Sequence, residues 1–416
     1  MKSSIWTFLS VCVRISFNFI INKLFAVHFG LSGLTLLAHF QNLLGMVTAL
    51  AGEGLNKGVV KFLSDKEINT TDKQCFFSAG ILLHLIIFLV ACLLVVVNYE
   101  NLRRFTGNFF FISWLTWVMI PLLANLLNLF CIAIVQSQHR FKLFSFLNTL
   151  NIVLSAFFIY LVAHKQDITL ALLAYNLGQG ISLFITLPLA WNTLSVFLPE
   201  LRKLSIQILE NKIKKLSDFL AIGLSIVVFS RFGFYLMREY NMATFGLAQT
   251  GLWEAAMRIS EGYTFTFNTT FLVIFYPKVA SLIPQPKRLQ RYCWQTLQLL
   301  IPLIIVGLSL AFLLREQLLI LLFDTSFLPA STLLAWVIVG DFFKFINYLL
   351  SNILIAKGKT RLFIFLQGVF IGLSFLMVYM LSDRFGLQAL PMTWVSTYIL
   401  SVVVLGVILR KDLLSS

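Results

Sequence analysis

Long apolar segments alternate with short basic ones along the whole chain. Each apolar segment is about twenty residues or longer, the length of α-helix needed to cross a hydrocarbon core of roughly 30 Å. This pattern predicts an all-α polytopic membrane protein. Its twelve expected transmembrane helices lie at about 5–27, 34–54, 75–98, 109–135, 143–163, 168–190, 217–237, 247–276, 295–314, 330–355, 362–381 and 387–409. An even number of spans places both termini on the same side of the membrane.

Lysine and arginine gather on one side of this predicted topology. One set of connections carries Lys57, Lys61, Lys66, Lys73, Arg140, Lys142, the Arg202–Lys215 cluster, Lys278, Lys287, Arg288, Arg291, Lys357, Lys359, Arg361, Arg410 and Lys411. The opposite connections carry only Arg103, Arg104, Lys165, Arg238, Arg315 and Arg384. By the positive-inside rule the first set is cytoplasmic. The asymmetry accounts for most of the net charge of +15, so the charge gives no reason to expect nucleic-acid binding.

One connection is longer than the others and divides the chain into halves. FLPELRKLSIQILENKIKKL (197–216) has an apolar face opposite charged residues, which is typical of a helix lying in the cytoplasmic membrane interface. We therefore expect an N-terminal lobe at 1–190, an amphipathic linker at 191–216 and a C-terminal lobe at 217–416. Two six-helix halves with the substrate path between them is a common transporter plan.

A short motif recurs in corresponding places of the two halves. FGLSGL (Phe29–Leu34) joins the first two spans, and FGLAQTGL (Phe245–Leu252) joins spans seven and eight. The match indicates an internal duplication, although a third Phe-Gly-Leu at 385–387 lowers its weight.

Ionisable residues inside the predicted spans are the candidates for function. A charge at the centre of a bilayer costs roughly 3 kcal/mol on insertion, so these residues are expected to face one another or water. They are Arg14, Lys23, Glu53, Arg231, Glu254, Arg258, Glu261, Asp341 and Lys344, with Arg238 at the end of a span. Because both halves contribute such residues on helical stripes, we expect a hydrated central cavity between the lobes.

Local neutralisation is the competing interpretation for two couples. Glu254 and Arg258 have the spacing of a helical ion pair, and Asp341 and Lys344 lie three residues apart. Each couple is either a self-paired structural feature or part of a binding site, and the sequence leaves both interpretations open.

Position near a span end gives a second competing interpretation. Lys23 and Arg238 are close enough to span ends for their side chains to reach lipid headgroups, and Glu53 is placed to pair with Lys57. The polar residues of spans four to six, namely Asn125, Asn128, Asn148, Asn151, Asn176 and Gln179, are typical of interhelical hydrogen bonds.

Two arginines stand apart because no acidic residue is close to them in the sequence. Arg14 and Arg231 are therefore the strongest candidates for binding an anionic group. Glu53, Glu254, Glu261 and Asp341 are candidates for coupling transport to an ion, since carboxylates inside membranes often carry protons or cations.

Signatures of catalysis are missing from the sequence. It contains no GxxxxGK[ST] phosphate loop, no HExxH and no GxSxG. The five cysteines and five histidines lack the spacing of metal ligands. We therefore expect no catalytic residues, no metal and no cofactor, and a transporter rather than an enzyme.

Several stretches resemble one transporter family, in order and across nearly the whole chain. They are SIWTFLS (Ser4–Ser10), NKLFAVHFG (Asn22–Gly30), LAGEGLNKGVVKF (Leu50–Phe62), LLAWVIVGDFFK (Leu333–Lys344) and LIAKG (Leu354–Gly358). The chain resembles the Wzx polysaccharide flippases of the multidrug/oligosaccharidyl-lipid/polysaccharide exporter superfamily. Among them it looks closest to the flippases of lipid III, the precursor of enterobacterial common antigen.

This resemblance implies a mechanism and a substrate class. Such flippases have two six-helix lobes in a V and move an undecaprenyl-pyrophosphate-linked oligosaccharide from the cytoplasmic to the periplasmic leaflet by alternating access. The family pattern puts basic residues at Arg14, Lys23, Arg238 and Lys344 and an acid at Asp341. Together with Arg231 and Arg258, these basic residues form the expected substrate site.

The resemblance also implies a location and partners. We expect a multi-pass protein of the bacterial inner membrane with both termini in the cytoplasm, in contact with membrane lipids. The polymerase and the chain-length regulator of the same pathway are candidate partners. Glu53 stands where the family has a small residue, and Glu254 and Arg258 stand where it is uncharged, so the glycan itself stays open between lipid III and an O-antigen repeat unit.

Two other functions compete with a flippase. A drug or cation exporter of the same superfamily predicts a cavity dominated by carboxylates, whereas the spans here carry more basic than acidic residues. A membrane polysaccharide polymerase or ligase predicts a long external loop with catalytic residues, and the external connections are short.

Overall fold

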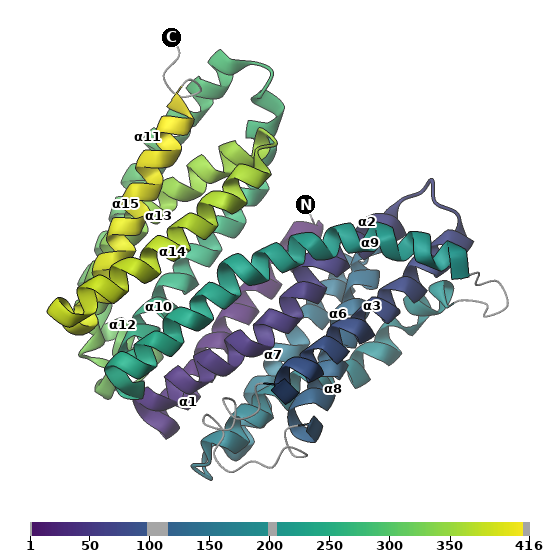
Figure 1. The fold of residues 1–416 in the computed structure, drawn as a ribbon, viewed down its shortest axis with the longest axis horizontal. Helices are drawn as coiled ribbons and strands as arrows, with labels where there is room; N and C mark the ends of the chain where they lie inside the picture. Colours follow the sequence, from purple (N-terminus) through teal and green to yellow (C-terminus); the bar gives the residue numbers. More distant parts are fainter. Residues whose placement is uncertain (1, 98–114, 199–205, 411–416) are drawn as a thin grey trace. The chain divides into compact units, whose positions relative to one another are not determined.

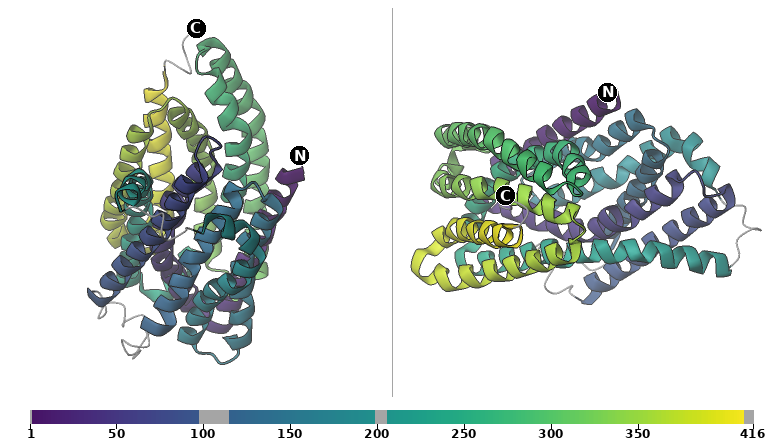
Figure 2. Two further views of the ribbon diagram at one scale, coloured as in Figure 1. Left: turned by 90° about the vertical axis from the view of Figure 1, so that its right-hand side faces the viewer. Right: turned by 90° about the horizontal axis from the view of Figure 1, so that it is seen from above.

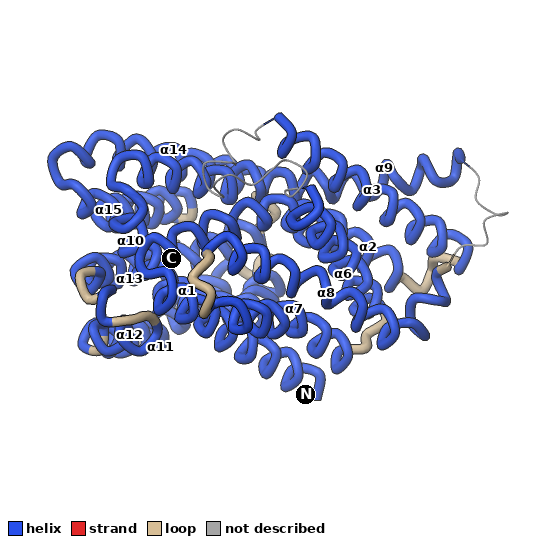
Figure 3. Tube along the Cα trace, turned by 90° about the horizontal axis from the view of Figure 1, so that it is seen from below, coloured by secondary structure: helices blue, strands red, loops and turns tan. Residues whose placement is uncertain are grey.

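The structure is a computed structural model that describes residues 2–97, 115–198 and 206–410. Some predicted features lie outside the described residues: the start of the span at 109, the loop residues Arg103 and Arg104, linker residues 199–205 with Arg202 and Lys203, and Lys411. Within the described ranges the chain consists of helices joined by short connections, and no strand is present (Figure 3). The predicted all-α fold is confirmed.

The helices follow one another with little chain between them. They are α1 Lys2–Ala49, η1 Leu50–Leu55, α2 Asn56–Ser64, α3 Thr70–Val97, η2 Leu115–Met119, α6 Ile120–Ser137, α7 Phe141–Ala163, α8 Ile168–Leu194, η3 Ser195–Phe197, α9 Ile206–Ile226, η5 Val227–Phe232, α10 Gly233–Leu282, α11 Pro286–Leu313, α12 Arg315–Leu322, η6 Thr325–Phe327, α13 Ala330–Ala356, α14 Thr360–Phe385, η7 Gly386–Gln388 and α15 Ala389–Ile408. The segments η1, η2 and η5 are π-helical, and η3, η6 and η7 are 3-10 turns.

Eight helical stretches within the described residues are long and apolar enough to cross a membrane. Two of them, 9–64 and 360–408, are 56 and 49 residues long. At 1.5 Å per residue these would be about 84 and 74 Å long, more than twice a hydrocarbon core of roughly 30 Å. Each therefore contains two crossings, and the chain is a multi-pass membrane protein.

Two further predicted spans are not among these eight stretches. Span seven is formed by α9, η5 and the start of α10, and span eight by the rest of α10 after Gly246. Arg231, Glu254 and Arg258 lie on these helices. Counting each long stretch as two crossings and adding these two spans gives the twelve helical segments predicted from the sequence.

The chain forms two compact units. The first contains residues 1–29 and 36–235, and the second contains residues 30–35 and 236–416. Residues 206–235 thus pack with the first unit, and the described end of the predicted linker is the first part of α9 rather than a separate helix. The lobe boundaries expected from the sequence stay a prediction.

The first unit is held together by helix pairs with polar contacts between them. Helix α8 packs against α6 and α7, and α9 runs beside η1 and α3 (Figure 1). Asn125 donates to the side chain of Gln179 over 2.8 Å, and Asn128 donates to Ser182 over 2.8 Å. These α6–α8 bonds confirm that the asparagines join helices, as small polar side chains do in membrane interiors.

The second unit is built around α13, α14 and α15, which lie side by side (Figure 2). An aromatic stripe on α10 forms part of its core. Phe267, Phe271 and Phe275 repeat every four residues on one helical face, with ring centroids 5.4 and 4.2 Å apart. The ring of Phe275 in turn stacks on the ring of Tyr292 of α11.

The repeated Phe-Gly-Leu motif marks kinks in two long helices. Gly30 in α1 has φ 62° and ψ −157°, and Gly246 in α10 has φ 81° and ψ 167°. Only glycine adopts this region readily, because a Cβ atom would clash with the backbone. The third copy also holds a positive φ, 53° at Gly386. All three copies therefore end a run of regular helix, which explains why the motif recurs.

Candidate functional site

A charge pair joins the two arms of α10. Arg238 Nε lies 2.6 Å from Glu254 Oε1, and Arg238 Nη2 lies 3.3 Å from Glu254 Oε2. The two side chains are only 13% and 8% exposed. Glu254 therefore binds Arg238, not the predicted partner Arg258. The idea that Arg238 reaches out to lipid headgroups is wrong for this structure, because its guanidinium is buried against a carboxylate.

A second charged cluster surrounds Asp341 in the interior of the second unit. Asp341 on α13 is fully buried and accepts hydrogen bonds from the Tyr263 hydroxyl and from Trp394 Nε1, the latter over 3.2 Å. Lys344 Nζ lies 3.9 Å from Asp341 Oδ1 and donates to Thr264 Oγ1 over 3.2 Å. The self-paired interpretation of this couple is confirmed.

The Lys344 ammonium also lies 4.9 Å from the centre of the Trp394 ring. An ammonium over an indole face gains electrostatic stabilisation, especially where water is excluded. Trp394 on α15 thus contacts the carboxylate with its N–H edge and the ammonium with its face. Such a closely satisfied network fixes α10, α13 and α15 relative to one another.

The three charged residues in the first half of span eight differ in how far their side chains are buried. Glu254 is buried, Arg258 is half-buried and Glu261 is exposed. Of these, Glu261 is the carboxylate most accessible from outside the unit.

Two predicted cations on α1 have exposed side chains. Arg14 and Lys23 are both exposed, whereas Asn22 between them is buried. No ion pair of Arg14 with a carboxylate is observed among the described residues.

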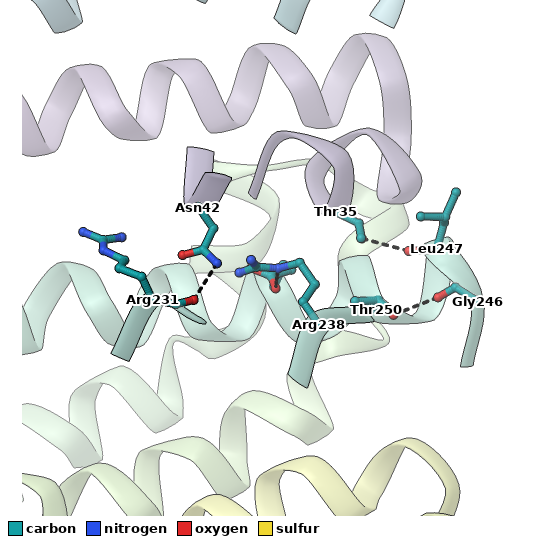
Figure 4. A network of polar contacts seen from close by, with 8 residues as sticks. Thr35, Asn42, Arg231, Arg238, Gly246, Leu247 and Thr250 are labelled. Carbon is teal, nitrogen blue, oxygen red and sulfur yellow. Dashed lines mark hydrogen bonds and ion pairs between the residues drawn. The ribbon is translucent and has the colours of Figure 1, made fainter. Parts of the chain in front are cut away.

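Arg231 occupies the π-helical segment η5, between α9 and α10. Its side chain is exposed, and its backbone carbonyl accepts a hydrogen bond of 2.9 Å from Asn42 Nδ2 on α1 (Figure 4). One turn away, the rings of His39 and Tyr235 lie 5.0 Å apart. His39 and Asn42 of span two therefore contact Tyr235 and Arg231 of span seven. Among the residues that the structure describes, Arg231 makes no ion pair with a carboxylate.

Glu53 lies in η1, and its side chain falls outside what the structure describes. Sequence reasoning missed Trp394 as a partner of Asp341 and Thr264 as a partner of Lys344, because both side chains are uncharged. Thr264 within α10 and Trp394 near the start of α15 carry no signal in the sequence of a partner on α13.

Comparison with known proteins extends the resemblance over the whole chain. The curated proteins named Lipid III flippase from Escherichia coli (strain K12) and from Shigella flexneri are each 24% identical to it over 421 aligned residues. The alignment covers 96% of this chain and 95% of each relative. No family model matches the sequence. The predicted resemblance to lipid III flippases is confirmed.

Solved structures establish the fold. An inward-facing multidrug resistance MATE family transporter of the MOP superfamily matches with a TM-score of 0.74 at 13% identity, covering 97% of this chain and 98% of its own. The lipid II flippase MurJ, in an inward closed conformation, matches with a TM-score of 0.72 at 14% identity, covering 99% and 89%. A MOP superfamily transporter from Pyrococcus furiosus matches with a TM-score of 0.66 at 13% identity, covering 99% and 95%. The chain therefore has the fold of these transporters.

Proposed function

We propose that the chain is a flippase that moves a polyprenyl-pyrophosphate-linked oligosaccharide from the cytoplasmic to the periplasmic leaflet of a bacterial inner membrane. The observation that carries this proposal is the similarity to lipid III flippases along 96% of the chain. The exposed cations supply the chemistry that such a substrate needs, because a pyrophosphate cannot enter hydrocarbon without counter-ions.

Six basic residues form the proposed substrate site: Arg14, Lys23, Arg231, Arg238, Arg258 and Lys344. Contacts and exposure separate four of them into two groups. Arg238 and Lys344 each have an acidic neighbour and are buried, so we assign them mainly to holding the second unit together. Arg14 and Arg231 have exposed side chains, so we assign the headgroup contact to them first.

The polyprenyl tail can stay in lipid during transport, so only the charged headgroup and the sugars need a polar path. The distribution of lysine and arginine supports cytoplasmic termini, since the basic connections lie on the side that contains both ends. The pathway polymerase and chain-length regulator stay predicted partners.

A reconstitution experiment tests the function directly. Full-length protein in liposomes is given a fluorescent polyprenyl-pyrophosphate disaccharide, and a membrane-impermeant quencher reports which leaflet holds the probe. We expect protein-dependent access of the quencher to probe that began in the inner leaflet, and a much smaller effect with the Arg14→Ala/Arg231→Ala double variant. If the protein does not flip this probe but does export ethidium, the result would favour the function of a drug exporter.

A cellular measurement complements the reconstitution. Removal of the gene should cause one lipid-linked glycan to accumulate in the cytoplasmic leaflet, and the sugar composition of that glycan would identify the natural substrate. If no lipid-linked glycan accumulates in cells that lack every other flippase, the proposal is wrong.

A further inference from the structure

Arg231 lies in an uncommon backbone element whose carbonyl is held by a neighbouring helix. A π-helical turn is rare and is frequently found at functional sites. In η5 the carbonyl oxygen of Arg231 accepts from Asn42 Nδ2 over 2.9 Å. The same arrangement recurs in η2, where Asn176 Nδ2 donates to the carbonyl oxygen of Val118 over 2.8 Å. A buried asparagine thus fixes a carbonyl of the π turn in both places.

The guanidinium of Arg231 lies against α1 at Gly45, where the helix carries no side chain. A methyl group added to Gly45 would sit 3.3 Å from Arg231 Nη1, 3.5 Å from Cζ and 3.7 Å from Nε. Because these three distances are similar, the plane of the guanidinium lies across the backbone at Gly45. An added methyl group would require the guanidinium to shift by a few tenths of an ångström, since real Cβ atoms rarely approach other atoms this closely.

Asn42 and Gly45 are three residues apart and so lie on one face of α1. They hold Arg231 at both ends, Asn42 by its main-chain carbonyl and Gly45 by the flat face of its side chain. The stacked pair Phe232 and Tyr235, with ring centroids 6.1 Å apart, stiffens the next turn. An arginine held in this way loses less conformational freedom when it binds a phosphate.

We infer that Asn42 and Gly45 are positioning residues that orient the Arg231 guanidinium toward a pyrophosphate headgroup. This inference rests on the proposed function, because it names the group that Arg231 would bind. Neither positioning residue touches the anion, so each acts only through Arg231. That dependence gives the inference a test that a general role in packing would fail.

The test measures binding of farnesyl pyrophosphate to the full-length protein in nanodiscs, which avoids the need to know the glycan. We expect Arg231→Ala to weaken binding about tenfold, the loss typical of one charge-assisted contact. Gly45→Ala and Asn42→Leu should each weaken it measurably but by less, because they displace the guanidinium without removing it. In the Arg231→Ala background, Gly45→Ala and Asn42→Leu should cause no further loss. The matched control is Gly372→Ala, where an added methyl group meets nothing within 4 Å.

Thermal stability provides a second readout. Alanine favours a helix more than glycine does, so Gly45→Ala should insert normally and melt no lower than the wild type while binding the probe less well. Wild-type binding by Gly45→Ala would overturn the inference. A loss that persists in the Arg231→Ala background would overturn it too, because it would show a role in packing.

The outcomes separate this inference from the proposed function. If the protein fails to flip the disaccharide probe but binds farnesyl pyrophosphate with the expected dependence on Gly45, the anion site stands and the transport proposal falls. If the wild type does not bind farnesyl pyrophosphate, the inference is wrong even where flipping is observed.

Discussion

Arg238 and Glu254 form a two-point ion pair although they lie sixteen residues apart on α10. Gly246 stands midway between them, and its positive φ breaks the helix into two arms. Thr35 reinforces the same corner by donating to the carbonyl oxygen of Leu247 over 2.8 Å, and Thr250 donates to that of Gly246 over 2.8 Å (Figure 4). The pair therefore stabilises the kink that joins spans seven and eight.

Breaking this pair should be more harmful than removing both partners. Glu254→Gln or Arg238→Met alone strands a buried charge, which typically costs about 3–5 kcal/mol, whereas the double variant strands none. We expect each single variant to lower the melting temperature in detergent and the double variant to recover much of the loss.

An exposed pair on α12 provides the matched control. Arg315 Nη2 and Glu316 Oε1 lie 3.9 Å apart with side chains 28% and 55% exposed. Exposed pairs contribute little, so Glu316→Gln should leave the melting temperature unchanged. A loss in the double variant equal to the sum of the losses in the two single variants would show that Arg238 and Glu254 act independently.

A close backbone approach fixes Gly251 as glycine. A Cβ atom at this position would lie 2.1 Å from the carbonyl oxygen of Leu31, which cannot move aside as a side chain would. We expect Gly251→Ala to lower the free energy of unfolding by roughly 1–3 kcal/mol, the cost of forcing a methyl group into a closely packed site. Unaltered stability, equal to that of Gly372→Ala, would contradict this.

The Asp341–Lys344 couple should behave as a structural unit. Asp341→Asn leaves the Lys344 ammonium without its carboxylate in a buried site, and Lys344→Met leaves the Asp341 carboxylate there without its ammonium. We expect both single variants to reach the membrane in reduced amounts and the Asp341→Asn/Lys344→Met variant to be recovered in greater amounts. If instead the double variant is well folded but does not transport, Asp341 or Lys344 takes part directly in the transport cycle.

The sequence predicted the helices and the twelve spans because these follow from hydropathy and helical period. It did not predict that Glu254 pairs with Arg238 in place of Arg258. The nearer partner satisfies the i, i+4 rule, but the kink at Gly246 brings Arg238 to the same place, and a sharp reversal between two arms is not visible in periodicity. The hydrogen bonds from Trp394 to Asp341 and from Lys344 to Thr264 were missed for a similar reason, because neutral side chains reveal no partner until the helices are packed.

The topology can be checked at single positions. A periplasm-reporting fusion at Asn69 or Gln207 should report the cytoplasm, and one at Arg103 or Asp383 should report the periplasm. The reverse result at any of these positions would change the number of spans within one half. It would also contradict the count of two crossings in each long helical stretch.

Glu261 is the best remaining candidate for coupling transport to an ion. It lies two turns beyond Glu254 on α10 and is exposed, whereas Glu254 and Asp341 are buried and bound to other side chains.

The variant Glu261→Gln keeps the shape and the hydrogen-bonding groups of this side chain but cannot ionise. We expect this variant to insert and melt like the wild type, because an exposed carboxylate contributes little to stability. Its transport should be several-fold slower and should lose any dependence on external pH between about 6 and 8, measured in cells that lack other flippases. Glu316→Gln, which also removes an exposed acid, should transport normally. Wild-type transport by Glu261→Gln across this range would show that Glu261 is only a solvated surface charge. Coupling would then not depend on a carboxylate of span eight that changes its protonation.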